Sequence, residues 1–310
     1  MEGPVPHAGA GEVLVRTLYL AVDPHMRGRA SARPLPQKTL SPGEVMTGGV
    51  VGQVIESNDP RVAPNDIVEG LLGWQEYSTA NAKTLRKIDP EMAPIPTALH
   101  ALGMPGLTAY FGLLEICRPQ PGETVLISGA SGAVGSLVGQ IAKIKRCRVV
   151  GITGSVDKVR FLTQELGFDA AFNHREPGDF QSRLKQVCPN GVDVYFDMVG
   201  GTTTDEVIRA LNTRARVALC AQVAHNGEPS HSGPRWLDQL THKQVRMEGF
   251  QVSQFSTRFE DGLRQMAAWI QQGKIRYQDE VVVGLENAPK AFVEMVLGEN
   301  IPRRLVKVAA

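Results

Sequence analysis

The chain has 310 residues and a formal net charge of +1, from 33 basic and 32 acidic side chains. This near-balance argues against a nucleic-acid-binding protein, which normally carries a basic excess or a basic stripe. The length predicts about two domains and suffices for a large core without disulfides or metal. Glycine is frequent, with 32 residues, against a typical share of about 7%.

The cysteines and the apolar segments indicate the cellular compartment in which the protein is expected. Cys117, Cys147, Cys188 and Cys220 are too far apart in sequence for a zinc knuckle or a redox dithiol, and they are typical of reduced, mostly buried thiols. No apolar run approaches the ~20 residues of a membrane span. The opening residues show no cationic segment followed by an apolar one. We therefore expect a cytoplasmic protein with no membrane or nucleic-acid partner.

The first part of the chain is predicted to be rich in β-structure. Alternating or glycine-opened apolar segments predict strands over residues 11–23, 48–55, 66–70 and 74–78. Residues 27–43 contain glycine, serine and several prolines, which predict a long exposed loop. Short strands separated by Pro and Gly suggest a small barrel-like domain.

From about residue 95, helices and continuous apolar strands alternate. Helices are expected over 98–117, 133–144, 157–166, 179–187 and 204–211, and strands over 124–128, 148–153, 170–173, 192–196 and 216–221. This alternation predicts an α/β fold with a doubly wound parallel sheet of the dinucleotide-binding (Rossmann) type.

The alternation of strands and helices is interrupted at residues 224–243. This segment is rich in Gly, Pro and polar side chains, which predict a long functional or mobile loop. After this loop the pattern predicts strands over 247–252, 280–285 and 304–308, and helices over 259–272 and 288–297.

The most informative segment is the glycine-rich turn of residues 127–135. Gly129, Gly132 and Gly135 are spaced three apart between a predicted strand and a predicted helix. Small residues at such a turn let backbone N–H groups approach a pyrophosphate, and the helix N-terminus adds positive dipole. A tight connection without a ligand is the alternative, but the surrounding alternation favours dinucleotide binding.

The end of the next strand predicts which dinucleotide binds. NAD enzymes usually carry an acid about 20 residues beyond the turn, to bind the ribose 2′-hydroxyl. Here Gly154 and Ser155 stand at the strand end, and Asp157 comes only inside the following helix. Lys158, with help from Arg175, could pair with a 2′-phosphate, although a solvated helix lysine is the alternative. The pattern favours NADPH over NADH.

A catalytic zinc site is not expected. Residues 1–99 contain no cysteine, and His7 and His25 are their only histidines, whereas such a site needs about three His, Cys or carboxylate ligands. Without a Lewis acid, hydride addition to an activated C=C bond suits the residues better than alcohol oxidation, because hydrogen bonds can stabilise an enolate.

Several segments together resemble the zinc-independent medium-chain dehydrogenase/reductase superfamily, and within it the prostaglandin reductase/alkenal double-bond reductase group. The segments are Ala21–Arg27, Gly103–Tyr110, Gly129–Gly139, Phe196–Gly201 and Gly298–Asn300. The resemblance covers nearly the full chain. It implies a GroES-like catalytic and substrate domain of residues 1–98 and 274–310 and a Rossmann NADPH-binding domain of residues 99–273. It also implies a homodimer through an edge of the nucleotide-domain sheet.

The resemblance also implies site residues. Gly132–Gly135 would hold the pyrophosphate and Lys158 the 2′-phosphate, while Cys220–Val223, Phe250–Val252 and Asn300 would flank the nicotinamide. The full set of expected cofactor-binding residues is Ser131, Gly132, Ala133, Val134, Gly135, Ser155, Lys158, His174, Met198, Cys220, Ala221, Gln222, Val223, Phe250, Gln251, Val252 and Asn300. Expected substrate-binding residues are His25, Met26, Met104 and Thr108.

The chain departs from the pattern of that group at several of these positions. His25 and His174 stand where tyrosine is usual, Met198 stands where asparagine is usual, and Pro302–Arg303 replace Gly–Lys. A protonated His174 could pair with phosphate. Members of the group also begin some residues earlier, with a first strand that is not seen here.

The loop after Cys220 normally carries a Tyr–Asn pair near the nicotinamide ribose. Here either His225 or Asn226 takes the tyrosine position, and these two are the candidate catalytic residues. His225 could donate a hydrogen bond or a proton to an enolate oxygen; a solvated loop histidine is the alternative.

The sequence thus predicts an NADPH-dependent enone or enal reductase that transfers hydride to the β-carbon of an apolar substrate. An NADPH quinone oxidoreductase is the alternative enzyme. The degraded motif positions also leave room for a non-catalytic NADPH-binding protein.

Overall fold

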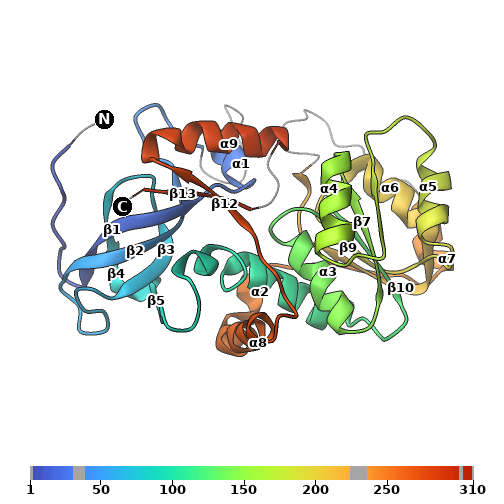
Figure 1. The fold of residues 1–310 in the computed structure, drawn as a ribbon, viewed down its shortest axis with the longest axis horizontal. Coiled ribbons are helices and arrows are strands. Elements are labelled where there is room, and N and C mark those ends of the chain that lie inside the picture. Colours follow the sequence, from blue (N-terminus) through green and yellow to red (C-terminus); the bar gives the residue numbers. More distant parts are fainter. Residues whose placement is uncertain (1–2, 31–38, 224–235, 300–302, 309–310) are drawn as a thin grey trace. The chain divides into compact units, whose positions relative to one another are not determined.

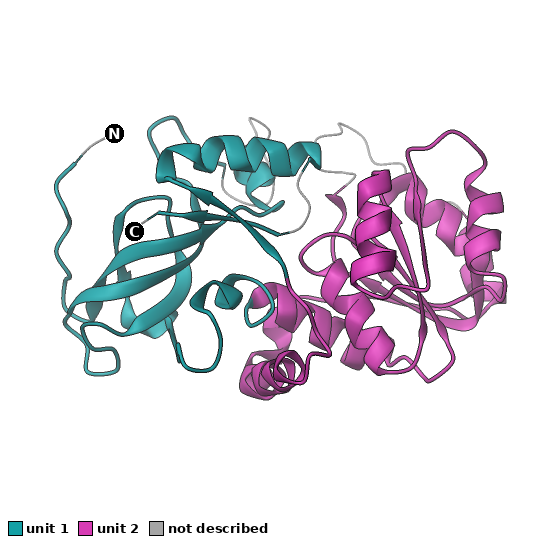
Figure 2. Cartoon of the chain, in the orientation of Figure 1, with its two compact units in different colours: residues 1–103, 278–310 teal, residues 104–277 magenta. Residues whose placement is uncertain are grey.

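The computed structural model of the chain describes residues 3–30, 39–223, 236–299 and 303–308. The chain divides into two compact units, residues 1–103 with 278–310 and residues 104–277 (Figure 1, Figure 2). Each unit contains its own sheet.

The sheet of the first unit has the strand order β12-β13-β1-β2-β3-β5, with β4 also paired to β1. Its strands are β1 (Glu12–Ala21), β2 (Thr47–Ser57), β3 (Ile67–Gly73), β4 (Tyr77–Asn81), β5 (Arg86–Ile88), β12 (Asp279–Val283) and β13 (Arg303–Lys307). Helices α1 (Met26–Arg29) and α9 (Ala288–Leu297) belong to the same unit. Because β13 pairs antiparallel with β1, the end of the chain completes the unit that the beginning starts.

Two details of this unit differ from the sequence prediction. The strand expected over residues 74–78 begins only at Tyr77, because Trp74 and Gln75 form a turn in which the N–H of Gln75 bonds the carbonyl of Gly73. Helix α1 occupies the start of the segment expected to be a loop, and its Met26 is fully buried. Residues 31–38 of that loop lie outside the described residues.

A buried ion pair joins the two ends of the chain in this unit. The Arg303 guanidinium in β13 donates to both carboxylate oxygens of Asp23, which follows β1, and to the carbonyl of Leu99 at 3.2 Å. Arg303 is 6% exposed. Burial raises the pKa of Asp23, but the charge and hydrogen bond of Arg303 outweigh it, so the pKa lies below its usual value.

We predict that Asp23→Asn lowers the free energy of unfolding by about 3 kcal/mol at neutral pH, because it leaves the buried Arg303 without a counter-charge. The folded-state pKa of Asp23 is depressed, so this stabilisation is present above the unfolded pKa of about 3.9 and is lost as the pH falls through the folded pKa. Urea unfolding across this range should show the gap between variant and wild type shrinking in acid. The exposed pair of Asp261 with Arg264 provides the control, because Asp261→Asn should change stability far less. An equal loss in both variants would contradict this account.

The second unit contains a parallel sheet of order β11-β10-β9-β6-β7-β8. The strands are β6 (Thr124–Ser128), β7 (Arg148–Thr153), β8 (Ala170–Asn173), β9 (Val192–Asp197), β10 (Leu211–Leu219) and β11 (Arg246–Gly249). The helices are α2 (Met104–Phe111), α3 (Gly135–Ile144), α4 (Val156–Arg160), α5 (Phe180–Val187), α6 (Gly201–Ala210), α7 (Leu237–His242) and α8 (Phe259–Gln271). Every strand pair in this sheet is parallel, which confirms the predicted doubly wound fold.

Several predictions for this part of the chain were wrong: α7 lies within residues 224–243, which were expected to form a loop, and β11 ends at Gly249 and not at residue 252. The helix expected over residues 98–117 is interrupted: a 3₁₀ helix spans Ile95–Leu99, and α2 starts only at Met104. At the break, a Cβ on Gly103 would lie 1.9 Å from the carbonyl oxygen of Ala98, so the chain packs too closely there for a continuous helix. Strand β10 begins at Leu211 and not at residue 216, since an irregularity between Leu211 and Arg216 hides its start from the apolar pattern.

Candidate cofactor site

The carboxyl ends of the central strands of the second unit define the candidate site. Strands β6 and β9 are neighbours in the sheet although β7 and β8 lie between them in the sequence, and the strand order runs outward from them in both directions. In open α/β sheets, ligands bind in the crevice beyond the carboxyl ends of the strands at such a reversal of strand order. The residues after Ser128 and Asp197 are therefore placed at the expected site.

The glycine-rich turn after β6 has no room for larger side chains. Gly129 has a φ of +61°, which favours glycine. A Cβ on Gly135 would lie 2.6 Å from the carbonyl oxygen of Gly129 and 2.8 Å from Cα of Ala130. The hydroxyl of Ser131 bonds that of Thr153 at 2.8 Å, which ties the turn to the end of β7. The turn leads directly into α3 (Gly135–Ile144), and the positive dipole end of a helix at such a turn suits an anion.

Basic side chains gather around the end of β7. Ser155 caps α4 by accepting from the backbone N–H of Lys158 at 3.3 Å. A Cβ on Gly154 would lie 3.4 Å from Nε of Arg175 and 3.6 Å from Cε1 of His174, so both side chains lie close to this glycine. Desolvation, followed by the charge of Arg175, lowers the pKa of Lys158. Neighbouring positive charges disfavour each other's charged form, and a phosphate bound between them would stabilise both charges.

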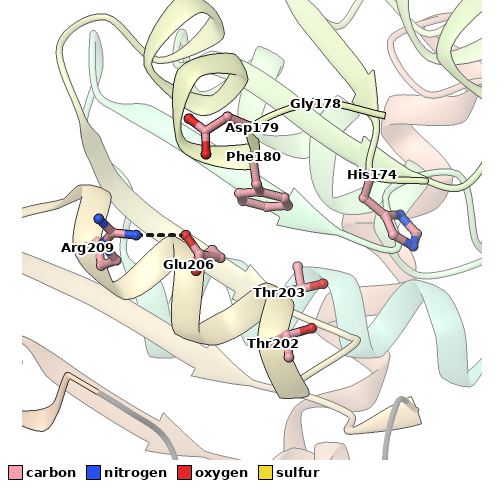
Figure 3. Close-up of a pocket in the computed structure, with 8 residues that line it drawn as sticks. All are labelled: His174, Gly178, Asp179, Phe180, Thr202, Thr203, Glu206 and Arg209. Atoms are coloured by element: carbon pink, nitrogen blue, oxygen red, sulfur yellow. Dashed lines mark hydrogen bonds and ion pairs between the residues drawn. The ribbon is translucent and has the colours of Figure 1, made fainter. Parts of the chain in front are cut away.

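His174 is held with a defined ring orientation. Its Nδ1 lies 2.7 Å from the carbonyl oxygen of Thr153, and since a carbonyl only accepts, Nδ1 carries the hydrogen. Nε2 is left to accept, or to donate when the ring is protonated. The ring borders a pocket of about 350 Å³ between α5 and α6, which Figure 3 shows. The other lining residues are Gly178, Asp179, Phe180, Thr202, Thr203, Glu206 and Arg209.

The pocket combines an aromatic ring with short polar side chains. The ring of Phe180 and the hydroxyl groups of Thr202 and Thr203 lie on its wall (Figure 3). Glu206 and Arg209 also line the pocket and form an ion pair at 3.1 Å (Figure 3). A flat heterocycle with hydrogen-bonding edges fits a lining of this kind.

A buried carboxylate organises the end of β9. Asp197 is 0% exposed, and its side chain accepts six hydrogen bonds that join the ends of β6, β9 and β10. The donors are the hydroxyls of Ser128 (2.9 Å), Tyr195 (3.0 Å) and Thr204 (2.6 Å), the amide of Gln222 (3.2 Å), and the N–H groups of Val199 (3.0 Å) and Gly200 (2.9 Å). We call these residues the Asp197 network.

Sequence reasoning missed this network. The sequence pattern includes Asp197 only within the segment Phe196–Gly201, although an acid at the end of a largely apolar strand is a detectable signal. Gly200, with φ of +75°, carries the N–H that donates to the network. A Cβ on Gly200 would lie 2.0 Å from Oε1 of Gln222, so the network packs against this glycine.

The segment after β10 lies beside Asp197. The N–H groups of Cys220 and Ala221 donate to the backbone carbonyl of Asp197 at 2.9 and 3.2 Å. Burial, followed by the charge of Asp197, raises the pKa of the Cys220 thiol to about 12. The residue after β11, Phe250, packs edge-to-face on Phe196 with ring centroids 6.1 Å apart. The ends of β9, β10 and β11 therefore form one continuous rim.

Comparison with known proteins assigns the chain to a family. The model described as "N-terminal domain of oxidoreductase" matches residues 1–88, and that described as "Zinc-binding dehydrogenase" matches residues 133–269. YfmJ of Bacillus subtilis (strain 168) is 47% identical over 99% of this chain and 91% of its own length. The NADPH-dependent curcumin reductase of Escherichia coli (strain K12) is 41% identical with the same coverage, and prostaglandin reductase 1 of Rattus norvegicus is 42% identical over 98% and 91%.

The chain belongs to the zinc-independent medium-chain dehydrogenase/reductase superfamily. Within it, the chain falls in the prostaglandin reductase/alkenal reductase group of NADP-dependent oxidoreductases, as the sequence predicted. The crystal structure of CurA from Vibrio vulnificus in complex with NADPH matches with a TM-score of 0.93 and 38% identity, over 100% of this chain and 94% of that one.

One of the two matching family models carries zinc in its description. In the described ranges, no three His, Cys, Asp or Glu side chains come close enough together to hold a metal ion. None of the helices in the same ranges is both long and apolar enough to cross a membrane.

The residues that the superfamily resemblance assigned to substrate are distributed over both units. In the first unit His25 is exposed and Met26 is fully buried. In the second unit Met104 is 45% exposed, and the hydroxyl of Thr108 donates to the Met104 carbonyl at 2.7 Å. The remaining candidates, His225, Asn226 and Asn300, lie outside the described residues.

Proposed function

We propose that the protein uses NADPH to reduce the C=C bond of α,β-unsaturated aldehydes and ketones. The observation that carries the cofactor assignment is the convergence of Lys158, Arg175 and His174 near Gly154, at the strand end where NAD enzymes carry an acid. The C=C bond is supported by relatives whose names specify curcumin, prostaglandin and 2-alkenal reductases.

In this proposal, residues around the glycine-rich turn would hold the cofactor. The backbone of Gly132–Gly135 would bind the pyrophosphate at the N-terminus of α3. Lys158 and Arg175 would bind the 2′-phosphate, and the pocket beside His174 would take the adenine. Cys220–Val223 and Phe250–Val252 would flank the nicotinamide, and Met198 would contribute to the cofactor site.

Bound NADPH supplies the hydride, which goes to the β-carbon of the substrate while a proton from solvent or an acid goes to the α-carbon. One NADPH and one proton are consumed for each saturated product. The chain's part is to orient the substrate carbonyl and to donate hydrogen bonds to the enolate oxygen as its charge develops. We assign the latter role to His225 or Asn226, and substrate contacts to His25, Met26, Met104 and Thr108. The two units have corresponding roles: the first unit is the catalytic and substrate domain, and the second is the cofactor domain.

A substrate panel tests the proposed reaction. The purified protein is mixed with NADPH and, separately, an enal, an enone, a quinone and a saturated aldehyde, and NADPH absorbance is followed. We expect oxidation of NADPH with the enal and the enone, and mass spectrometry should show the saturated carbonyl product. Turnover with the quinone alone would favour the alternative oxidoreductase, and no turnover with any compound would refute the enzyme assignment.

We also propose a cytoplasmic homodimer that forms through β11. This strand is last in the order of the six-stranded sheet and pairs with β10 on one side. An edge strand offers backbone groups for pairing with a second copy. Light scattering during size-exclusion chromatography should give twice the chain mass, and the single-chain mass would contradict the dimer.

A further inference from the structure

Among the described residues, the contacts of the Asp197 carboxylate include no opposite charge. All six of its hydrogen-bond donors are neutral: three hydroxyls, one side-chain amide and two backbone N–H groups. N–H groups, which can only donate, reach both carboxylate oxygens: those of Val199 and Gly200 reach Oδ1, and that of Gln222 reaches Oδ2. The side chain is therefore satisfied as a carboxylate and leaves a net charge of one electron in the interior.

This charge lies on the nicotinamide side of the reversal in strand order. The hydrogen bond from Ser128 to Asp197 spans the ends of β6 and β9, where that reversal occurs. The carbonyl of Asp197 accepts from Cys220 and Ala221, the first residues of the segment proposed to flank the nicotinamide. Burial, followed by the charge of Asp197, raises the pKa of the Cys220 thiol in the same segment.

A fixed negative charge at this place has a chemical consequence. Hydride donation leaves a positive charge on the nicotinamide. A buried carboxylate lowers the energy of a nearby positive charge more than a solvated one does, because little water screens it. The hydrogen bonds of the network hold the carboxylate in place, so it does not need to reorient when the charge develops.

We propose that Asp197 is a positioning residue whose buried charge favours the oxidised, cationic nicotinamide and so promotes hydride donation. The proposal rests on the proposed function, since it requires NADPH as the hydride donor. It assigns Asp197 no contact with substrate or cofactor; its effect is transmitted by its field across the rim of β9 and β10.

The proposal is tested by measuring the Kd values for NADP⁺ and NADPH in the variant Asp197→Asn. This substitution removes the negative charge and keeps the size and shape of the side chain. NADPH binding is followed by its fluorescence and NADP⁺ binding by calorimetry. We expect the ratio of the Kd for NADP⁺ to the Kd for NADPH to rise about tenfold over wild type. This factor corresponds to a rise of about 30 mV in the two-electron potential of the bound cofactor relative to the free cofactor. A purely structural loss would weaken both forms by the same factor and leave the ratio unchanged.

Two control variants separate charge from packing and from net charge. Asp193 lies near the other end of β9, where it accepts from the N–H of Thr124 at 2.8 Å and from Asn212 at 2.7 Å. Asp193→Asn removes the same charge far from the rim, and Thr204→Val removes one donor of the network but leaves the carboxylate. Both should keep the Kd ratio of the wild type within about twofold.

If Asp197→Asn does not fold, Gln222→Lys gives a second test. Gln222 is exposed and its amide already contacts Oδ2 of Asp197, so a lysine there brings a cation to the carboxylate and should also raise the ratio. An unchanged ratio in the folded Asp197 variant, or an equal rise in Asp193→Asn, would overturn the proposal. If the wild type fails to bind NADPH at all, the proposed function is wrong instead.

Discussion

Gly135→Ala should remove most NADPH binding and destabilise the second unit. A methyl group at this position would meet the Gly129 carbonyl oxygen at 2.6 Å and the Ala130 backbone at 2.8 Å, and neither can move like a flexible side chain. Alanine gains about 1 kcal/mol over glycine in a helix. Overpacking against backbone costs about 3 kcal/mol, so we expect a net loss of about 2 kcal/mol, and a displaced turn that binds NADPH at least tenfold more weakly.

Gly132→Ala is the matched control in the same turn. A Cβ at this position would meet only the Gly129 carbonyl oxygen, at 3.3 Å, so a small shift accommodates it. Its free energy of unfolding should stay within about 1 kcal/mol of wild type. Urea unfolding and NADPH fluorescence titration give both quantities for each variant. If Gly135→Ala is as stable as Gly132→Ala, or binds NADPH as wild type does, the claim that close packing of the turn supports stability and NADPH binding is wrong.

The cofactor half of the site could be predicted from the sequence because its signals are local. The turn of residues 127–135 combines an apolar strand, three spaced glycines and a helix, and each part constrains the next few residues. The absence of an acid at the strand end, where Gly154 and Ser155 stand, is likewise visible in a short window. The structure adds that Arg175 and His174, from the end of β8, approach Gly154.

The Asp197 network could not be predicted in the same way because its members are distant in sequence. Ser128 and Asp197 are 69 residues apart and meet only because β6 and β9 pair in the sheet. Gln222 comes to the same carboxylate from the end of β10. A residue's neighbours across a parallel sheet depend on strand order, which the apolar pattern of a single strand does not encode.

The buried ion pair of Asp23 with Arg303 also could not be predicted from local sequence, because its two residues are even farther apart in the chain. These residues are 280 apart, and the pairing of β13 with β1 brings them together. The resemblance marked the position of Arg303 only as a departure from the usual lysine. Its role in joining the chain ends emerges from the sheet register and not from the motif.

Lys158→Ala should convert the strong preference for NADPH into a weak one. A charge-assisted hydrogen bond contributes about 1.5–3 kcal/mol, so we expect NADPH to bind about 10- to 100-fold more weakly. NADH lacks the 2′-phosphate, so its affinity should change less than twofold. Titrating both cofactors by fluorescence gives the two Kd values directly, without any substrate. Equal weakening of NADH and NADPH would contradict the assignment of Lys158 to the 2′-phosphate.

Helix α4 supplies a control for this prediction. Arg160 follows Lys158 by two residues on the same helix, is exposed, and pairs with Asp157 at 3.3 Å. Arg160→Ala removes an equal charge from the same helix. A nonspecific electrostatic effect would weaken NADPH binding in both variants. If Lys158 contacts the 2′-phosphate specifically, Arg160→Ala should bind NADPH as wild type does. Arg175→Ala should have a smaller effect than Lys158→Ala, because Arg175 is exposed and Lys158 is half-buried. The double variant should discriminate least between the two cofactors, since it leaves only His174 beside the 2′-phosphate.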